Sequence, residues 1–140
     1  MLGAHEASEM RYVTPALRIL SGVAYTVFGL NGFLAFMPAP ETLPREVLDF
    51  LNALASSGYM LQLIGATQIV AGVLLLVNRF VPLALALLAP FLVNSIAFHV
   101  ALEPTGLPMA LVFVAIEIYL AWVYRDAFRP MLRAKVQASE

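Results

Sequence analysis

The sequence contains no cysteine, only two histidines and few charges of either sign. Without cysteine the chain has no disulfide, CxxC redox couple, thiolate nucleophile, iron–sulfur cluster or lipoprotein anchor. The two histidines, His5 and His99, argue against a conventional zinc site or a bis-histidine haem within one chain. We therefore expect no metal site and no intrinsic cofactor.

Charged residues make up only 12% of the chain, and the formal net charge is −1. A nucleic-acid partner would require a basic stripe, so this class of partner is not expected. The sequence also lacks a glycine-rich phosphate loop, a nucleophile elbow, an HExxH motif and a dinucleotide-binding fingerprint. None of the enzyme classes that these motifs identify is therefore indicated.

Apolar residues are what the chain has in abundance. It is 140 residues long and 61% hydrophobic, with a mean hydropathy of +0.86. A soluble domain carries about half apolar and about a quarter charged residues. One domain of this length cannot hide so large an apolar surplus from water. The composition therefore predicts a single all-α membrane domain over residues 1–140, with the lipid bilayer as its main partner.

Four apolar stretches approach the length of about 20 residues that a transmembrane helix needs. They cover residues 17–37, 59–77, 81–102 and 108–124. The first is expected to be retained rather than cleaved as a secretory signal, because Glu6 and Glu9 accompany Arg11 in its flank. Prolines lie at the ends of several of these stretches, where they favour the start or the end of a helix. Since the later connections are short, the sequence predicts an antiparallel bundle of four transmembrane helices.

The connection between the first two stretches contains an amphipathic segment, residues 44–56. Arg45, Asp49, Asn52 and Ser56 share one helical stripe, and apolar residues occupy the other. This pattern predicts a short helix that lies along the outer membrane interface or caps the bundle.

The basic residues are unevenly distributed across the expected topology. Four spans place both termini and the turn at residues 78–80 on one side of the membrane. Seven of the eight basic residues would lie there, and only Arg45 on the other side: Arg11, Arg18, Arg79, Arg125, Arg129, Arg133 and Lys135. The positive-inside rule then predicts that both termini, including the tail 125–140, are cytoplasmic.

Glycines recur at helical spacing within the first two stretches. In lipid, helices associate through small residues and hydrogen bonds rather than through hydrophobic burial. The glycines are therefore expected to form helix-packing faces: Gly22, Gly29 and Gly32 in the first stretch, and Gly58, Gly65 and Gly72 in the second.

Polar residues within the apolar stretches fall into two tiers of depth, given a rise of about 1.5 Å per residue. A central tier holds Glu117, Asn94 and Gln68, and an outer tier holds His99, Gln62 and Asn31. Ser95 lies one turn before His99 on the same face. These seven residues are the candidate ligand-binding residues; interhelical hydrogen bonding is the alternative role.

Glu117 is the costliest of these residues, because a charged acid at the centre of a membrane helix is disfavoured by roughly 3 kcal/mol. We expect it to face the bundle interior and to be often protonated. As an acid it would donate to Asn94 or Gln68, and as a switchable acid it would relay a proton or contact a polar ligand.

Four segments resemble the bacterial DoxX-like membrane proteins. They are residues 28–33 (FGLNGF), 69–82 (IVAGVLLLVNRFVP), 93–102 (VNSIAFHVAL) and 106–130 (GLPMALVFVAIEIYLAWVYRDAFRP). The resemblance implies a four-helix bundle in the bacterial inner membrane. The family takes its name from a small membrane subunit associated with archaeal quinone-linked sulfur oxidation, and wider relatives include partners in membrane redox complexes.

Three functions remain open from the sequence. The first is a non-catalytic accessory or scaffold subunit that binds a partner protein or a lipophilic ligand. The second is a quinone-binding subunit of a redox complex, in which His99 and Glu117 supply hydrogen bonds and protons while Phe91, Phe98 and Phe113 surround the ring. Such a subunit needs an electron-carrying partner protein. The third is a small-solute or proton transporter, which would require a homo-oligomer.

Overall fold

The computed structural model describes residues 3–38 and 40–139, so the extreme ends of the expected 1–140 domain lie outside the described residues. All regular structure within these residues is helical, which confirms the all-α prediction. The main helices are α1 (Ala4–Leu34), α2 (Arg45–Ser56), α3 (Met60–Leu76), α4 (Val81–Ala101) and α5 (Leu107–Val123). Short elements complete the chain: η1 (Pro104–Gly106), α6 (Arg125–Phe128) and η2 (Arg129–Leu132).

The bounds of α2 to α5 differ by at most one residue from those predicted, whereas α1 begins 13 residues earlier than expected and ends three residues earlier. Hydropathy marks only the apolar part of α1, but its polar first turns are also helical. The Glu6 carboxylate accepts a hydrogen bond from the Gly3 backbone N–H at 3.2 Å and so stabilises the start. At the other end, Ala35 adopts a left-handed conformation with φ 48°.

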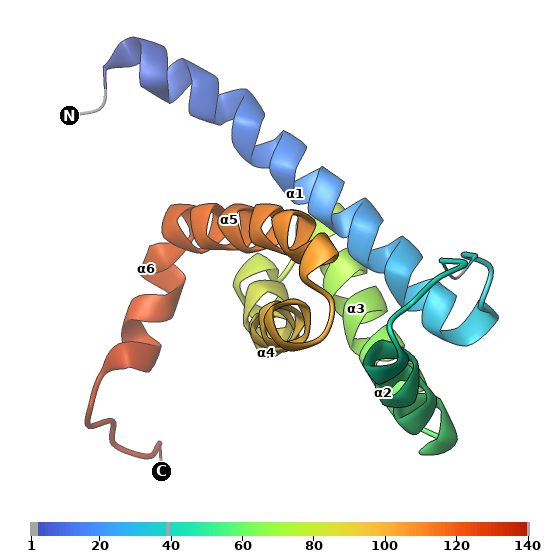
Figure 1. Cartoon of the computed structure of the whole chain (residues 1–140). Coiled ribbons are helices and arrows are strands. Elements are labelled where there is room, and N and C mark those ends of the chain that lie inside the picture. Colours follow the sequence, from blue (N-terminus) through green and yellow to red (C-terminus); the bar gives the residue numbers. More distant parts are fainter. Residues whose placement is uncertain (1–2, 39, 140) are drawn as a thin grey trace.

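The helices form a ring of neighbours. α1 packs most extensively against α3, α4 packs against both α3 and α5, and α5 returns to contact α1. The N-terminal turns of α1 project beyond the other helices, and α6 turns away sharply from the end of α5 (Figure 1). α1 and α3 run antiparallel, because Gly22 lies opposite Gly72 while Gly29 lies opposite Gly65.

Within the described residues, three helical segments are long and apolar enough to span a membrane: Glu6–Leu34, Val81–Ala101 and Pro104–Val123. The fourth expected span is different, because α3 has only 17 residues. At about 1.5 Å per residue it is roughly 26 Å long, slightly less than the ~30 Å of a hydrocarbon core. Helices α2 and α3 satisfy the same length and hydropathy requirement together, but they are bent by 86° at the break between them.

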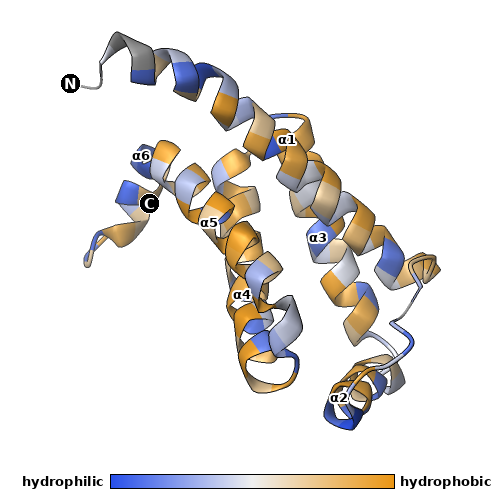
Figure 2. Cartoon of the chain, turned by 45° about the horizontal axis from the view of Figure 1, so that its top comes forward, coloured by the Kyte–Doolittle hydropathy of each residue, from blue (hydrophilic) through white to orange (hydrophobic). Residues whose placement is uncertain are grey.

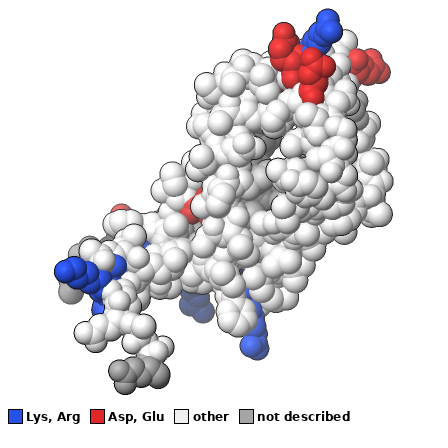
Figure 3. Space-filling model, turned by 90° about the horizontal axis from the view of Figure 1, so that it is seen from below, with Lys and Arg blue, Asp and Glu red and all other residues white. Residues whose placement is uncertain are grey.

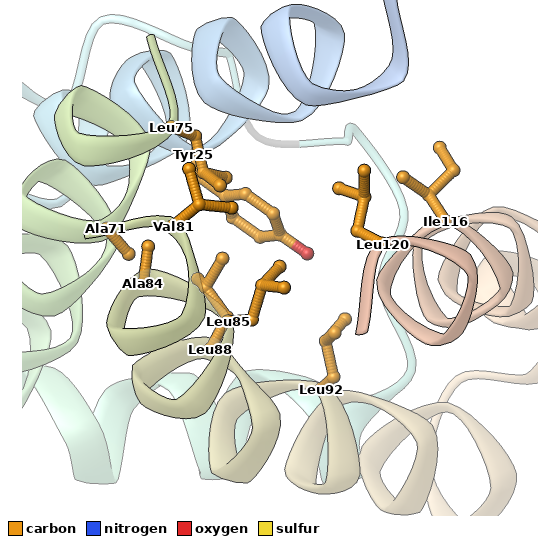
Figure 4. Packing of buried hydrophobic residues seen from close by; sticks show 10 residues of the cluster. All are labelled: Tyr25, Ala71, Leu75, Val81, Ala84, Leu85, Leu88, Leu92, Ile116 and Leu120. Carbon is orange, nitrogen blue, oxygen red and sulfur yellow. The ribbon is translucent and has the colours of Figure 1, made fainter. Parts of the chain in front are cut away.

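A small core lies at the centre of the ring. Ten buried residues from α1, α3, α4 and α5 form it, and Figure 4 shows them converging: Tyr25, Ala71, Leu75, Val81, Ala84, Leu85, Leu88, Leu92, Ile116 and Leu120. Most of the apolar surface lies outside this core. Large side chains such as Val93, Val100 and Ile118 are more than 60% exposed. The outer faces of α4 and α5 are accordingly hydrophobic (Figure 2), as expected for helices solvated by lipid.

Charged side chains gather at two ends of the molecule, and the surface between them is almost uncharged (Figure 3). One end carries α2, with its Arg45–Asp49 pair. The other end carries the turn after α3 and the start of α6. Arg18 belongs to this second end, because its guanidinium donates hydrogen bonds to the carbonyl oxygens of Leu75 and Leu76 in the last turn of α3.

Candidate functional site

The most chemically distinctive cavity lies between α1, α4 and α5 and has a volume of about 310 Å³. This volume is at the small end of the range of about 300–1,000 Å³ that is usual for ligand sites. Most of its wall is apolar, and four aromatic rings contribute to it. We call it the aromatic cavity; its lining is Tyr25, Phe28, Phe91, Leu92, His99, Gly106, Met109, Ala110 and Phe113.

The aromatic rings hold one another in place. The Tyr25 ring lies 5.5 Å from that of Phe113 and 6.1 Å from that of Phe91, measured between ring centroids. Phe28 is 6.3 Å from Phe113 on the same measure. These separations and tilted orientations are those that aromatic pairs prefer. The side chains that would contact a ligand are therefore positioned in advance.

Tyr25 lines this cavity and carries a buried polar group without a partner. The residue is only 3% exposed, and its hydroxyl is buried without a hydrogen bond within the described part of the chain. Figure 4 shows the hydroxyl pointing inward among leucines of α4 and α5. A buried hydroxyl normally has a partner, because leaving one unpaired costs roughly 1–3 kcal/mol. Tyr25 was not among the ligand-binding residues predicted from the sequence, although a polar aromatic residue beside a glycine face was a usable signal.

His99 lies at the end of the cavity nearest the loop between α4 and α5. Its Nδ1 atom is 2.9 Å from the carbonyl oxygen of Glu103 and 3.1 Å from Oε2 of the same residue. The Glu103 carboxylate also accepts hydrogen bonds from the Gly106 backbone N–H and from the Thr105 hydroxyl. His99 is thus fixed within a local cap, with its ring against the aromatic cavity.

Gly106 makes this cap possible. A Cβ atom at this position would lie 2.7 Å from Glu103 Oε2 and would overlap the His99 ring. The close approach of the α5 start to His99 therefore requires a residue without a side chain. Neither Glu103 nor Gly106 was selected from the sequence, because their importance depends on how the loop folds back onto α4.

The structure does not assemble the expected central tier of Glu117, Asn94 and Gln68. Gln68 is buried on α3 with 6% exposure, Glu117 is half-buried on α5, and Asn94 is exposed. No hydrogen bond joins any two of these side chains within the described residues. The expectation that Glu117 donates to Asn94 or Gln68 is therefore not met. Similar depth did not bring them together, because the helices are rotated differently. On α4 the core-facing side is marked by the buried Leu92, and Asn94 lies about 200° around the helix from it, on the outer side.

Asn94 and Glu117 instead line two separate grooves. Asn94 borders an open groove of about 470 Å³ between α2, α3 and α4, whose only other polar lining residue is Thr67. Glu117 borders a groove of about 320 Å³ between α4 and α5, which we call the α4–α5 groove. Its other lining residues are all apolar: Ala89, Leu92, Val93, Ile96, Val114 and Ile118.

The outer tier is also divided. His99 lines the aromatic cavity, Ser95 is half-buried outside the described lining of that cavity, and Gln62 is exposed. Asn31 has a local role, because its Oδ1 accepts a hydrogen bond from the Met37 backbone N–H at 2.7 Å just after α1 ends. Of the seven predicted ligand-binding residues, only His99 reaches the aromatic cavity.

Five of the six glycines lie where α1 and α3 touch. A Cβ at Gly29 would be 2.6 Å from the Gly65 carbonyl oxygen, and one at Gly72 would be 2.8 Å from that of Gly22. Gly32 approaches the carbonyl oxygen of Leu61 at 3.0 Å on the same measure. Here the two backbones meet so closely that no side chain fits.

Gly58 does not have the packing role that was predicted for it. It lies in the turn between α2 and α3 with φ +78°, and a Cβ there would have nothing within 4 Å. Its function is to adopt a left-handed backbone conformation that other residues rarely take. The regular seven-residue spacing was therefore misleading at this position.

In comparisons with known proteins, no family model, curated protein or solved structure matches the chain. Within the described residues, no group of three or more histidine, aspartate or glutamate side chains is arranged to hold a metal ion.

Proposed function

We propose that this chain is a multi-pass protein of the DoxX-like kind in the bacterial inner membrane, with an accessory, non-catalytic role. In this role it binds a lipophilic molecule in the aromatic cavity. The observation that carries the proposal is a cavity walled by aromatic rings, one of which, Tyr25, bears a buried hydroxyl without a partner within the described residues. A ligand with an oxygen acceptor would satisfy the hydroxyl, and its apolar body would contact the rings.

The charge distribution supports the orientation proposed for the protein. Arg18 reaches the end of α3, and the Thr14 hydroxyl lies 2.9 Å from that of Tyr119 on α5. These contacts bring the N-terminal part of α1 and the C-terminal part of α5 to the same end of the molecule as Arg79. The basic residues of both chain termini therefore accompany that turn, and the positive-inside rule assigns this end to the cytoplasm.

One observation favours a quinone as the lipophilic molecule. His99, Phe91 and Phe113 line the same cavity, so the hydroxyl of the reduced form, a quinol, could donate a hydrogen bond to the His99 ring while the quinol ring lies against the aromatic side chains. Glu117 lines a different groove and is not part of this version of the site. A quinone-linked reaction would still need a redox partner protein to carry electrons.

The experiment is native mass spectrometry of the protein released from mild detergent, compared with a cavity-filling variant. Ala110 lines the cavity and is 6% exposed, whereas Ala115 is exposed on the same helix. We expect a co-purified small molecule in the wild type and in Ala115→Phe, but not in Ala110→Phe. The measured mass would identify a quinone, and the same spectra report the number of subunits. Equal occupancy in both variants would refute the proposed site.

A further inference from the structure

The α4–α5 groove presents a carboxyl group at membrane depth without a counter-charge. Glu117 is the tenth residue after Leu107, or about 15 Å along a helix that is roughly 26 Å long. No hydrogen bond or ion pair joins it to another described residue. Tyr25 is close enough to interact with it electrostatically, but a neutral phenol supplies no positive charge.

The groove opens sideways rather than into the bundle. Val93 and Ile118, on its two walls, are 72% and 64% exposed on the hydrophobic outer surface of α4 and α5. An amphiphile dissolved in the hydrocarbon region could therefore reach Glu117 without crossing the aromatic cavity. Leu92, which lines both the groove and the cavity, lies between the two spaces.

The sequence restricts where a positive charge for Glu117 can come from. Residues 19–44, 46–78 and 80–124 contain no lysine or arginine. A second copy of the chain would therefore offer no lysine or arginine at this depth. His99 is already engaged by Glu103 in the cap. A counter-charge for the ionised form of Glu117 would therefore have to come from another molecule.

We infer that the α4–α5 groove binds a hydrophobic cation, with the Glu117 carboxylate as its counter-ion and the apolar walls around its body. In a low-dielectric groove an opposite charge interacts far more strongly than in water. A neutral amphiphile of the same shape gains only the apolar contacts, which lipid also provides. A proton carried by the carboxyl leaves to water as the cation binds, so the site remains uncharged overall.

The site therefore selects by charge and not by shape alone. It is distinct from the aromatic cavity, where the unpartnered group is a hydroxyl and the walls are aromatic. Phosphonium ions and protonated tertiary amines with large apolar substituents have this chemistry. Their positive charge would pair with the carboxylate, and their substituents would contact the apolar walls.

The test uses tetraphenylphosphonium as the cation and triphenylmethane, which has no hydrogen-bonding group, as a neutral probe of similar bulk. Binding to the full-length protein in mild detergent is measured by equilibrium dialysis or calorimetry. We expect the wild type to bind the cation at least tenfold more tightly than the neutral probe. Glu117→Gln should lose at least tenfold in affinity for the cation, whereas Glu46→Gln, on exposed α2, should bind as the wild type does.

Two further variants test whether a loss of binding comes from misfolding or from binding in the aromatic cavity. Glu117→Asp retains the charge and should bind the cation more tightly than Glu117→Gln, which controls for any loss of folding in the glutamine variant. Ala110→Phe should lose its cavity ligand but retain the cation. Equal cation affinity in wild type and Glu117→Gln, no binding by the wild type, or loss of binding in Ala110→Phe would each overturn the inference.

Discussion

The guanidinium of Arg18, on α1, donates a hydrogen bond to the backbone carbonyl oxygen of Leu75, which is 57 positions later in the chain and in the last turn of α3. The last carbonyl groups of a helix have no partner within the helix and carry its partial negative charge. A buried arginine, 9% exposed, therefore stabilises the end of a neighbouring helix rather than lying free in the interface.

Replacing Arg18 should consequently destabilise the protein. Arg18→Met removes the cap and leaves carbonyl groups unpaired in a buried position, at a cost of about 1–3 kcal/mol. We expect a lower midpoint of thermal unfolding in detergent, followed by circular dichroism. Arg11→Met, at an exposed position of the same helix, is the control and should unfold at the wild-type temperature. Equal midpoints for both variants would show that the cap does not stabilise α3.

The α1–α3 contact should be intolerant of any side chain at its glycines. A Cβ at Gly65 would be 2.6 Å from the Gly29 carbonyl oxygen, and backbone cannot move aside as a flexible side chain can. Gly65→Ala is expected to lower the free energy of unfolding by about 1–3 kcal/mol. The measurement is unfolding in increasing concentrations of denaturing detergent. Gly3→Ala, where a Cβ meets nothing within 4 Å, should have no comparable effect.

Tyr25→Phe should separate stability from ligand binding. In protein freed of ligand the Tyr25 hydroxyl has no partner, so its removal is expected to leave the stability of that form unchanged or to raise it by about 1–3 kcal/mol at most. The same change should reduce the co-purified ligand observed by native mass spectrometry. Tyr119→Phe is the matched control, because it removes the contact with Thr14 and should cost about 0.5–1.5 kcal/mol while the ligand is retained. Lower stability in Tyr25→Phe would imply that the hydroxyl is paired.

Gly106→Ala should disrupt the His99 cap. The added Cβ overlaps the His99 ring and crowds Glu103, so the imidazole must leave the carboxylate or the start of α5 must shift. We expect a stability loss of about 1–3 kcal/mol and a clear change in the His99 side-chain resonances in an NMR spectrum of the detergent-solubilised protein. Unchanged His99 resonances would contradict the packing described for Gly106.

Much of the fold could be predicted because it is encoded locally. The apolar runs and their prolines predicted the bounds of α3 to α5 to within one residue, and the amphipathic stripe did the same for α2. The start of α1 could not be predicted in this way, because its first turns are polar. Hydrogen bonding such as that between Gly3 and Glu6 stabilises them, and hydropathy does not measure it. The glycine spacing predicted packing faces on two helices, which the structure brings together as the α1–α3 contact, but it wrongly included Gly58, whose backbone conformation is set by the turn.

The candidate site was less predictable, because depth along a helix can be counted from the sequence whereas the direction a side chain faces depends on how each helix is rotated. Glu117, Asn94 and Gln68 were placed at similar depths, yet each faces a different space.

The sequence by itself determined that this is a helical protein for a lipid environment, since composition and hydropathy are properties of the chain. Only the tertiary structure decided that Tyr25 and His99 share a cavity while Glu117 faces a separate groove. The reason is physical: the rotation of each helix is set by close packing at glycines and by contacts between residues far apart in the chain, such as Arg18 and Leu75.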